Sequence, residues 1–172
     1  MALTQQFARV TPAYLERCRT SALDSPGGAP GWHPPPTDLL DTDWAIWGLI
    51  RYCRATGTDA GLIALLDRAV SGDPGGDIGF LDQDEVHDGI DGPPRLLGPA
   101  TVAEIARALY AVDLDDLLAE LPSHPMDAAA ACGFVREFAG DVRDYLVEHF
   151  TAMQEFYGGA ARRGQCMVVW TD

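Results

Sequence analysis

The chain has 172 residues, of which 47% are hydrophobic, which is typical of one globular domain and too apolar for a disordered chain. It carries 26 acidic residues against 12 basic ones, all of them arginine, so its formal net charge is −14. This balance argues against binding to nucleic acid or to an anionic membrane surface, because both need a basic patch. A solubilising role, a basic protein partner or a cation remain compatible with the charge.

Localisation and thiol chemistry follow from apolar runs and cysteine spacing. No apolar run approaches the ~20 residues of a membrane-spanning helix, and the first residues lack the basic and apolar regions of a secretory signal. Four cysteines lie far apart without a CxxC pair, which excludes a local zinc knuckle or a redox dithiol (Cys18, Cys53, Cys132 and Cys166). We therefore expect a cytoplasmic protein with buried, reduced thiols and no cofactor.

The first half of the chain predicts one strand and three helices. Residues 2–10 alternate weakly and predict a strand, and Thr11-Pro12 then opens a helix that runs to about Ser21. The segment 25–36 holds five prolines and three glycines and predicts an irregular loop that Trp32 pins to the surface. Two further helices are expected. One starts after Asp41-Thr42-Asp43, runs to about Thr56 and is ended by Gly57, and the other covers 59–70.

The second half predicts an acidic loop, further helices and a final strand. A glycine-rich loop over 72–94 leads into a short extended piece at 95–98. Thr101 to Glu104 has the pattern of a capping box at the start of an amphipathic helix. A short leucine-rich helix over 114–121 follows, then a long helix from Val142 that Gly158-Gly159 weakens and Gly164 ends, and a strand over 166–170. The order predicts a mostly helical α+β single domain over 1–172, with a small sheet formed by the N- and C-terminal strands and a short central strand.

Three stretches of this sequence, taken in order, resemble the YfbM-like family, the domain of unknown function numbered 1877. They are Leu40-Asp41-Thr42-Asp43 before a Trp-bearing helix, residues 92–99 before Val102-Ala103-Glu104-Ile105, and residues 145–157 before the terminal strand. The resemblance covers most of the chain. It implies a fold of mixed helices with a small sheet, and it implies no established activity.

The acidic stretch 82–91 is the best candidate for a metal loop by its number of carboxylates. An EF-hand loop needs oxygen ligands at positions 1, 3 and 5, glycine at 6 and glutamate at 12. Starting at Asp84 places Val86 at position 3 and Arg95 at position 12, and starting at Asp82 places Val86 at position 5. Both registers fail, so we predict a solvated loop and no metal site.

Other catalytic signatures are missing. There is no HExxH, GxSxG, GxGxxG or Gly-Lys-Ser sequence. His149 falls on the apolar stripe of the last helix, where a core histidine is the expected role.

Three polar residues are candidates for ligand binding. Asp41 and Asp43 flank a helix start, where carboxylates usually cap the helix, although such a pair also suits general acid–base chemistry. Arg95 follows two prolines that fix where its side chain emerges, so it either pairs with a neighbouring carboxylate or binds an anionic ligand.

Two hypotheses for function follow from these patterns. The first is a non-enzymatic protein-interaction domain, of the inhibitor or immunity type, that binds a basic protein partner and uses tryptophans as anchors (Trp32, Trp44, Trp47 and Trp170). The alternative is a small enzyme or small-molecule-binding module with a pocket near Asp41, Asp43 and Arg95.

Overall fold

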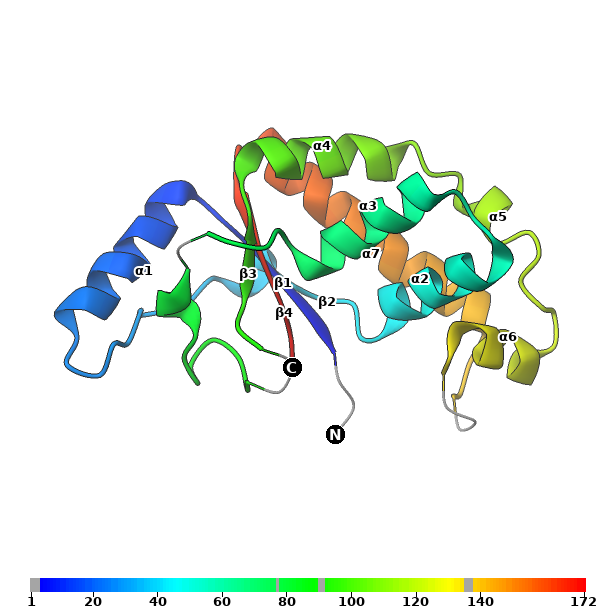
Figure 1. Cartoon of the computed structure of the whole chain (residues 1–172), viewed down its shortest axis with the longest axis horizontal. Helices are drawn as coiled ribbons and strands as arrows, with labels where there is room; N and C mark the ends of the chain where they lie inside the picture. Colours follow the sequence, from blue (N-terminus) through cyan, green and yellow to red (C-terminus); the bar gives the residue numbers. More distant parts are fainter. Residues whose placement is uncertain (1–3, 77, 90–91, 135–137) are drawn as a thin grey trace.

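The computed structural model describes residues 4–76, 78–89, 92–134 and 138–172, and within them helices pack on a small antiparallel sheet (Figure 1). The strands are β1 (Gln5–Val10), β2 (Leu39–Asp41), β3 (Arg95–Leu97) and β4 (Cys166–Thr171). The helices are α1 (Pro12–Asp24), α2 (Ala45–Thr56), α3 (Ala60–Ser71), α4 (Pro99–Tyr110), α5 (Leu114–Leu117), α6 (Pro125–Cys132) and α7 (Val142–Arg162), with 3-10 turns η1 (Pro36–Asp38) and η2 (Gly79–Leu81). The predicted α+β class is confirmed, including the sheet built from terminal and central strands.

The sheet has the order β2-β1-β4-β3, and every neighbouring pair is antiparallel. β1 and β4 pair along their whole length, from Gln5 opposite Thr171 to Val10 opposite Cys166. Thr4 and Asp172 extend this ladder by exchanging two backbone hydrogen bonds of 2.6 and 3.0 Å. All six residues of β4 are buried. The strand has a neighbour on each edge, and a hydrophobic core covers each of its two faces.

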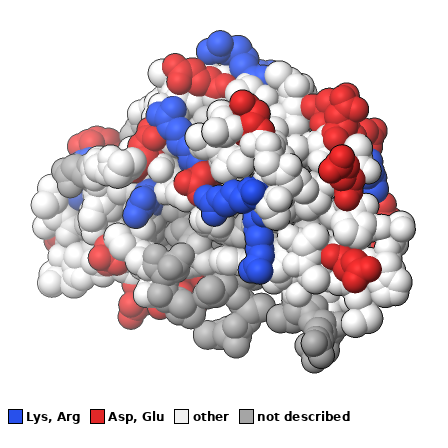
Figure 2. All heavy atoms as spheres, turned by 45° about the vertical axis from the view of Figure 1, so that its right-hand side comes forward, with Lys and Arg blue, Asp and Glu red and all other residues white. Residues whose placement is uncertain are grey.

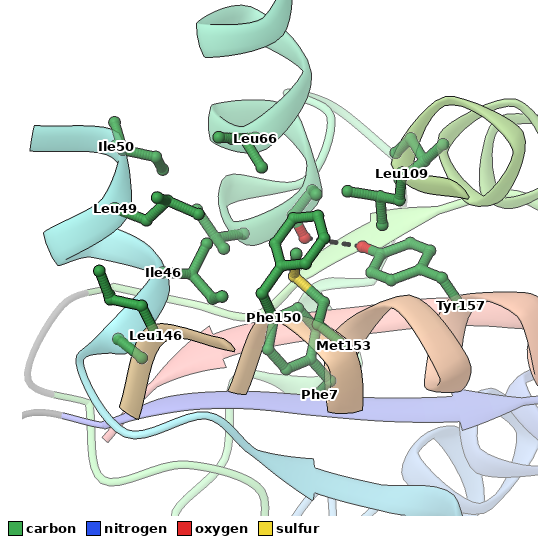
Figure 3. Packing of buried hydrophobic residues seen from close by; sticks show 14 of the residues in the cluster. Phe7, Ile46, Leu49, Ile50, Leu66, Leu109, Leu146, Phe150, Met153 and Tyr157 are labelled. Atoms are coloured by element: carbon green, nitrogen blue, oxygen red, sulfur yellow. Dashed lines mark hydrogen bonds between the residues drawn. The ribbon is translucent and has the colours of Figure 1, made fainter. Parts of the chain in front are cut away.

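The two faces of the sheet support two separate cores, because side chains alternate along each strand. Phe7 faces the larger core, where it meets residues of α2, α3, α4 and α7 (Figure 3). Residues of α6 also belong to this core. Ala8 and Val10 face the smaller core, under α1 and the proline-rich loop. In that core Trp32 lies edge-on to Tyr14 and Trp170, at centroid distances of 5.7 and 6.4 Å, so it pins the loop as predicted.

The longest helix, α7, forms the floor of the larger core. Leu146, Phe150, Met153 and Tyr157 recur at spacings of three and four and are all buried. The helix continues through Gly158 and Gly159 to Arg162, so the predicted weakening there is not seen. A Cβ at Gly159 would lie 2.6 Å from a guanidinium nitrogen of Arg9, so any larger residue there would displace the Arg9 side chain. Arg9 uses that space to pair with Asp38 at 2.8 Å.

Two further local predictions were wrong. α4 begins at Pro99, and the Val102 amide donates to the Gly98 carbonyl at 2.9 Å, so Thr101 is already inside the helix and no capping box forms. Proline at the first helical position, with its fixed φ, sets this earlier start. His149 is half-buried and lies edge-on to Tyr145 at 4.6 Å, outside the core.

Tyr157 links α7 to α3 through a buried hydrogen bond, in which its hydroxyl donates to the Ala69 carbonyl at 2.7 Å. That carbonyl lies in the last turn of α3, where no backbone amide is available within the helix. Tyr157→Phe should therefore lower the free energy of unfolding by about 1–3 kcal/mol, since a buried carbonyl loses its donor. Tyr110→Phe, at a tyrosine that is 56% exposed, is the matched control and should change stability little. Equal urea midpoints for both variants would contradict this role.

The four cysteines are free and buried in this fold. Burial raises the pKa of Cys132 to about 11 and raises the pKa of each of the other three thiols. We expect the native protein to resist a thiol reagent such as DTNB at pH 8, and all four thiols to react in guanidinium chloride. Rapid labelling of one thiol in the native protein would show that a cysteine is accessible and ionised.

Candidate functional site

The three site residues predicted from the sequence lie at opposite edges of the sheet. Asp41 ends the edge strand β2 and Asp43 follows it, while Arg95 begins the other edge strand, β3. β1 and β4 lie between them. The structure therefore brings the two aspartates together and does not bring Arg95 to them.

Asp41 and Asp43 shape the turn between β2 and α2. The Asp43 amide donates to the Asp41 carboxylate at 2.6 Å, and Asp43 has a left-handed φ of 49°, which aspartate tolerates better than most residues. α2 begins only at Ala45, and its N-cap, Trp44, makes no side-chain capping bond. The prediction that these aspartates cap the helix is corrected, because their geometry forms the turn before it.

Tyr145 of α7 adds a further group beside Asp43. Burial raises the pKa of Tyr145, and the nearby Asp43 carboxylate raises it further. A tyrosine is protonated at neutral pH even without this shift, so its hydroxyl can act as a hydrogen-bond donor. This pair adjoins the turn between β2 and α2, and neither residue is among those that line the cavities described below.

Arg95 lies beside a cavity of about 120 Å³ on the helical face of the sheet. The lining comes from α2, the end of α3, β3, β4 and the segment before β3 (Trp47, Val70, Ser71, Gly92, Pro93, Arg95, Val169, Trp170 and Thr171). Among the described residues Arg95 has no ion pair, and nearby Asp73 is engaged with Arg68 through bonds of 2.6 and 2.8 Å. The expected pairing of Arg95 with a carboxylate is not found in this part of the chain.

The buried side-chain amide of Gln5 links Trp47 to Trp170, two residues that line this cavity. The Trp47 indole donates to Gln5 Oε1 at 2.9 Å, and Gln5 Nε2 donates to the Trp170 carbonyl at 3.0 Å. Gln5 is fully buried, so breaking either bond would leave a polar group unsatisfied. Trp47 also stacks on Trp44 at 5.6 Å. Of the four tryptophans predicted as anchors, Trp32 and Trp170 are buried and the stacked pair is half-buried.

The acidic loop of η2 is organised around His87. Asp82 lies 3.0 Å from His87 Nε2, and the Gly89 amide donates to His87 Nδ1 at 3.0 Å, which places the ring proton on Nε2. Residues 90 and 91 of the predicted loop lie outside the described residues. In the rest of the chain that the structure describes, no three histidine, cysteine or acidic residues are grouped to hold a metal.

A wider, shallower depression lies where α3, α4 and α5 meet, toward the end of the molecule at which α5 is drawn in Figure 1. We call it the α3–α5 groove; its volume is about 600 Å³, and it is lined by Gly61, Leu62, Leu65, Ala108, Ala111, Val112, Asp113, Asp116 and Leu117. A second depression of about 490 Å³ lies on the other side of the α4–α5 turn, against α7. For this region the sequence predicts only a short leucine-rich helix over 114–121 and no binding surface.

Carboxylates dominate parts of the surface in view in Figure 2. They gather at the upper right of that face, while most arginines in view lie nearer its middle and top. Several arginines are already neutralised by neighbours, including Arg143 by Asp115 at 2.7 Å and Arg54 by Asp67 at 3.2 Å. Because acidic residues outnumber basic ones by 26 to 12 in the chain, many carboxylates have no arginine to pair with and the net charge is strongly negative.

No helix within the described residues is long and apolar enough to cross a membrane.

Comparisons with known proteins place the chain in a family. Residues 32–170 match the model of the family described as a domain of unknown function, DUF1877. The crystal structure of YfbM from Escherichia coli, described as a protein of unknown function, shares the fold with a TM-score of 0.58 and 14% sequence identity, over 96% of this chain and 98% of that chain. Curated proteins gave no match. The resemblance stated from the sequence is confirmed, and the chain belongs to the DUF1877 family.

Proposed function

We propose that this chain is a non-enzymatic protein-interaction domain that binds a basic partner protein, in the manner of inhibitors and immunity proteins. The observation that supports this most is the combination of an exposed apolar groove with a strongly negative surface. An apolar depression supplies binding energy, and surrounding carboxylates select a cationic partner and accelerate encounter. The buried thiols, held protonated by their raised pKa values, offer no nucleophile at neutral pH.

The interaction proposal predicts a partner that is retained by charge. The immobilised chain should enrich one stoichiometric basic protein from a lysate of its host at low ionic strength, and salt should weaken that capture, because exposed charges are screened beyond about 10 Å at 0.1 M. An unrelated acidic protein of similar size and charge, immobilised in the same way, is the control for ion exchange. Absence of any protein enriched over this control, even at low ionic strength, would count against the proposal.

A second candidate function is supported by the position of Arg95. Arg95, which is exposed, lines the cavity of about 120 Å³ together with the hydroxyl-bearing residues Ser71 and Thr171. A guanidinium with neighbouring hydroxyls suits a small oxyanion, such as a carboxylate or a phosphate group. Under this alternative the chain is a small-molecule-binding module.

The oxyanion candidate is tested by substituting Arg95. Inorganic phosphate should raise the melting temperature of the wild-type protein more than sodium chloride of equal ionic strength, since a ligand bound to the native state stabilises it. Arg95→Gln should remove this difference, and Arg107→Gln, at an exposed arginine of α4 that does not line the cavity, should keep it. The same response in both variants would exclude Arg95 as the anion ligand.

A further inference from the structure

The α3–α5 groove has apolar walls that the fold leaves half-covered. Leu62 and Leu65 come from α3, and Leu117 comes from α5. These leucines and Val112, which precedes α5, are half-buried, with one side packed on the larger core and the other open to the groove. The apolar surface of the groove is thus continuous with the larger core, which packs against its inner side.

The charged residues that line the groove are all negative. Asp113 and Asp116 belong to its lining, and no arginine does. The Asp113 carboxylate accepts from the Asp116 amide at 3.1 Å, which fixes its position at the start of α5 but leaves its charge. Among the described residues Asp116 and the nearby exposed Glu120 form no ion pair, whereas Asp115 is paired with Arg143.

These two features restrict what the groove accommodates. A neutral apolar segment would bury Asp113 and Asp116 without a counter-charge, which is unfavourable, and an anionic segment would be repelled. A segment with both an apolar stripe and cations satisfies both features. Grooves between helices commonly accept an amphipathic helix, whose residues at i, i+3/i+4 and i+7 enter the groove.

We propose that the α3–α5 groove is the binding surface of this domain and that its occupant is a basic amphipathic helix of the partner protein. The apolar stripe of that helix packs on Leu62, Leu65 and Leu117, and its lysines or arginines face Asp113 and Asp116. This inference rests on the proposed function, which requires a basic partner and does not specify where it binds.

The probe is a fluorescent synthetic peptide of about 18 residues, long enough to form a helix, with leucines at i, i+3/i+4 and i+7 and with lysine and arginine elsewhere. A scrambled peptide of the same composition keeps the charge and removes the stripe. Fluorescence anisotropy with the full chain should show tighter binding of the ordered peptide. Equal affinity of the two peptides would overturn the helical occupant.

Substitutions in the groove locate the binding surface. Leu65→Arg should weaken binding of the ordered peptide at least about tenfold, or about 1.4 kcal/mol. Ala111→Arg, at an exposed position of the same groove, introduces the same bulk and charge without removing a core contact and should have the same direction of effect. Leu23→Arg, at a leucine of α1 that is 81% exposed, is the matched control and should bind as the wild type does. Melting temperatures of all variants verify that each is folded.

The charge contribution is tested by a pair of neutralising substitutions. Asp116→Asn combined with Glu120→Gln should weaken binding and reduce its dependence on salt. Glu16→Gln combined with Asp24→Asn removes the same charge from α1 and should leave binding close to that of the wild type.

The outcomes distinguish an error in the location of the binding surface from an error in the proposed function. Salt-dependent binding that neither Leu65→Arg nor Ala111→Arg weakens would overturn the groove and leave an acidic interaction domain standing. Failure of both peptides to bind at low ionic strength would overturn the basic occupant, and together with an empty capture from the lysate it would overturn the proposed function.

Discussion

The pairing of β1 with β4 is the constraint on which the rest of the structure depends. These strands stand at opposite ends of the described chain, yet they form the two central positions of the sheet. Every residue of β4 is buried, since one face lies under the long helices and the other under α1 and the proline-rich loop. Both cores therefore close only when this pair has formed, and the edge strands β2 and β3 are added to it.

Much of this arrangement was predictable because local chemistry and global fold agree. The stripe of Leu146, Phe150, Met153 and Tyr157 specifies an amphipathic helix, and each of these side chains is in fact buried. Gly57 adopts the left-handed conformation that ends α2, with a φ of 71°. The terminal strands were predictable from their β-branched residues and from the alternation of apolar and polar residues. In these segments, residues close together in the sequence are sufficient to determine the local structure.

The remaining features depend on contacts between distant segments. β2 is only three residues long, and it forms a strand because it pairs with β1. Nothing local marks it as a strand, so the sequence predicted Asp41 as a helix cap. The cavity beside Arg95 needs Trp47, Ser71 and Thr171, which come from three separate elements. The α3–α5 groove similarly joins Leu62 to Leu117. Sequence patterns identified charge and helix content there, but only the fold determines which leucines remain half-covered.

The central strand pair also has a consequence for synthesis on the ribosome. Gln5 and Trp170, joined by a buried side-chain bond, are 165 residues apart in sequence. At about 5–20 residues per second, β1 waits roughly 8–30 s before β4 is translated. During that interval β1 has only the short strand β2 to cover one of its edges, and the helices of the larger core have no complete sheet to pack on. Until β4 is made, the edge of β1 that β4 covers is unpaired, and an unpaired strand edge favours aggregation, whereas the net negative charge of the chain opposes it by mutual repulsion.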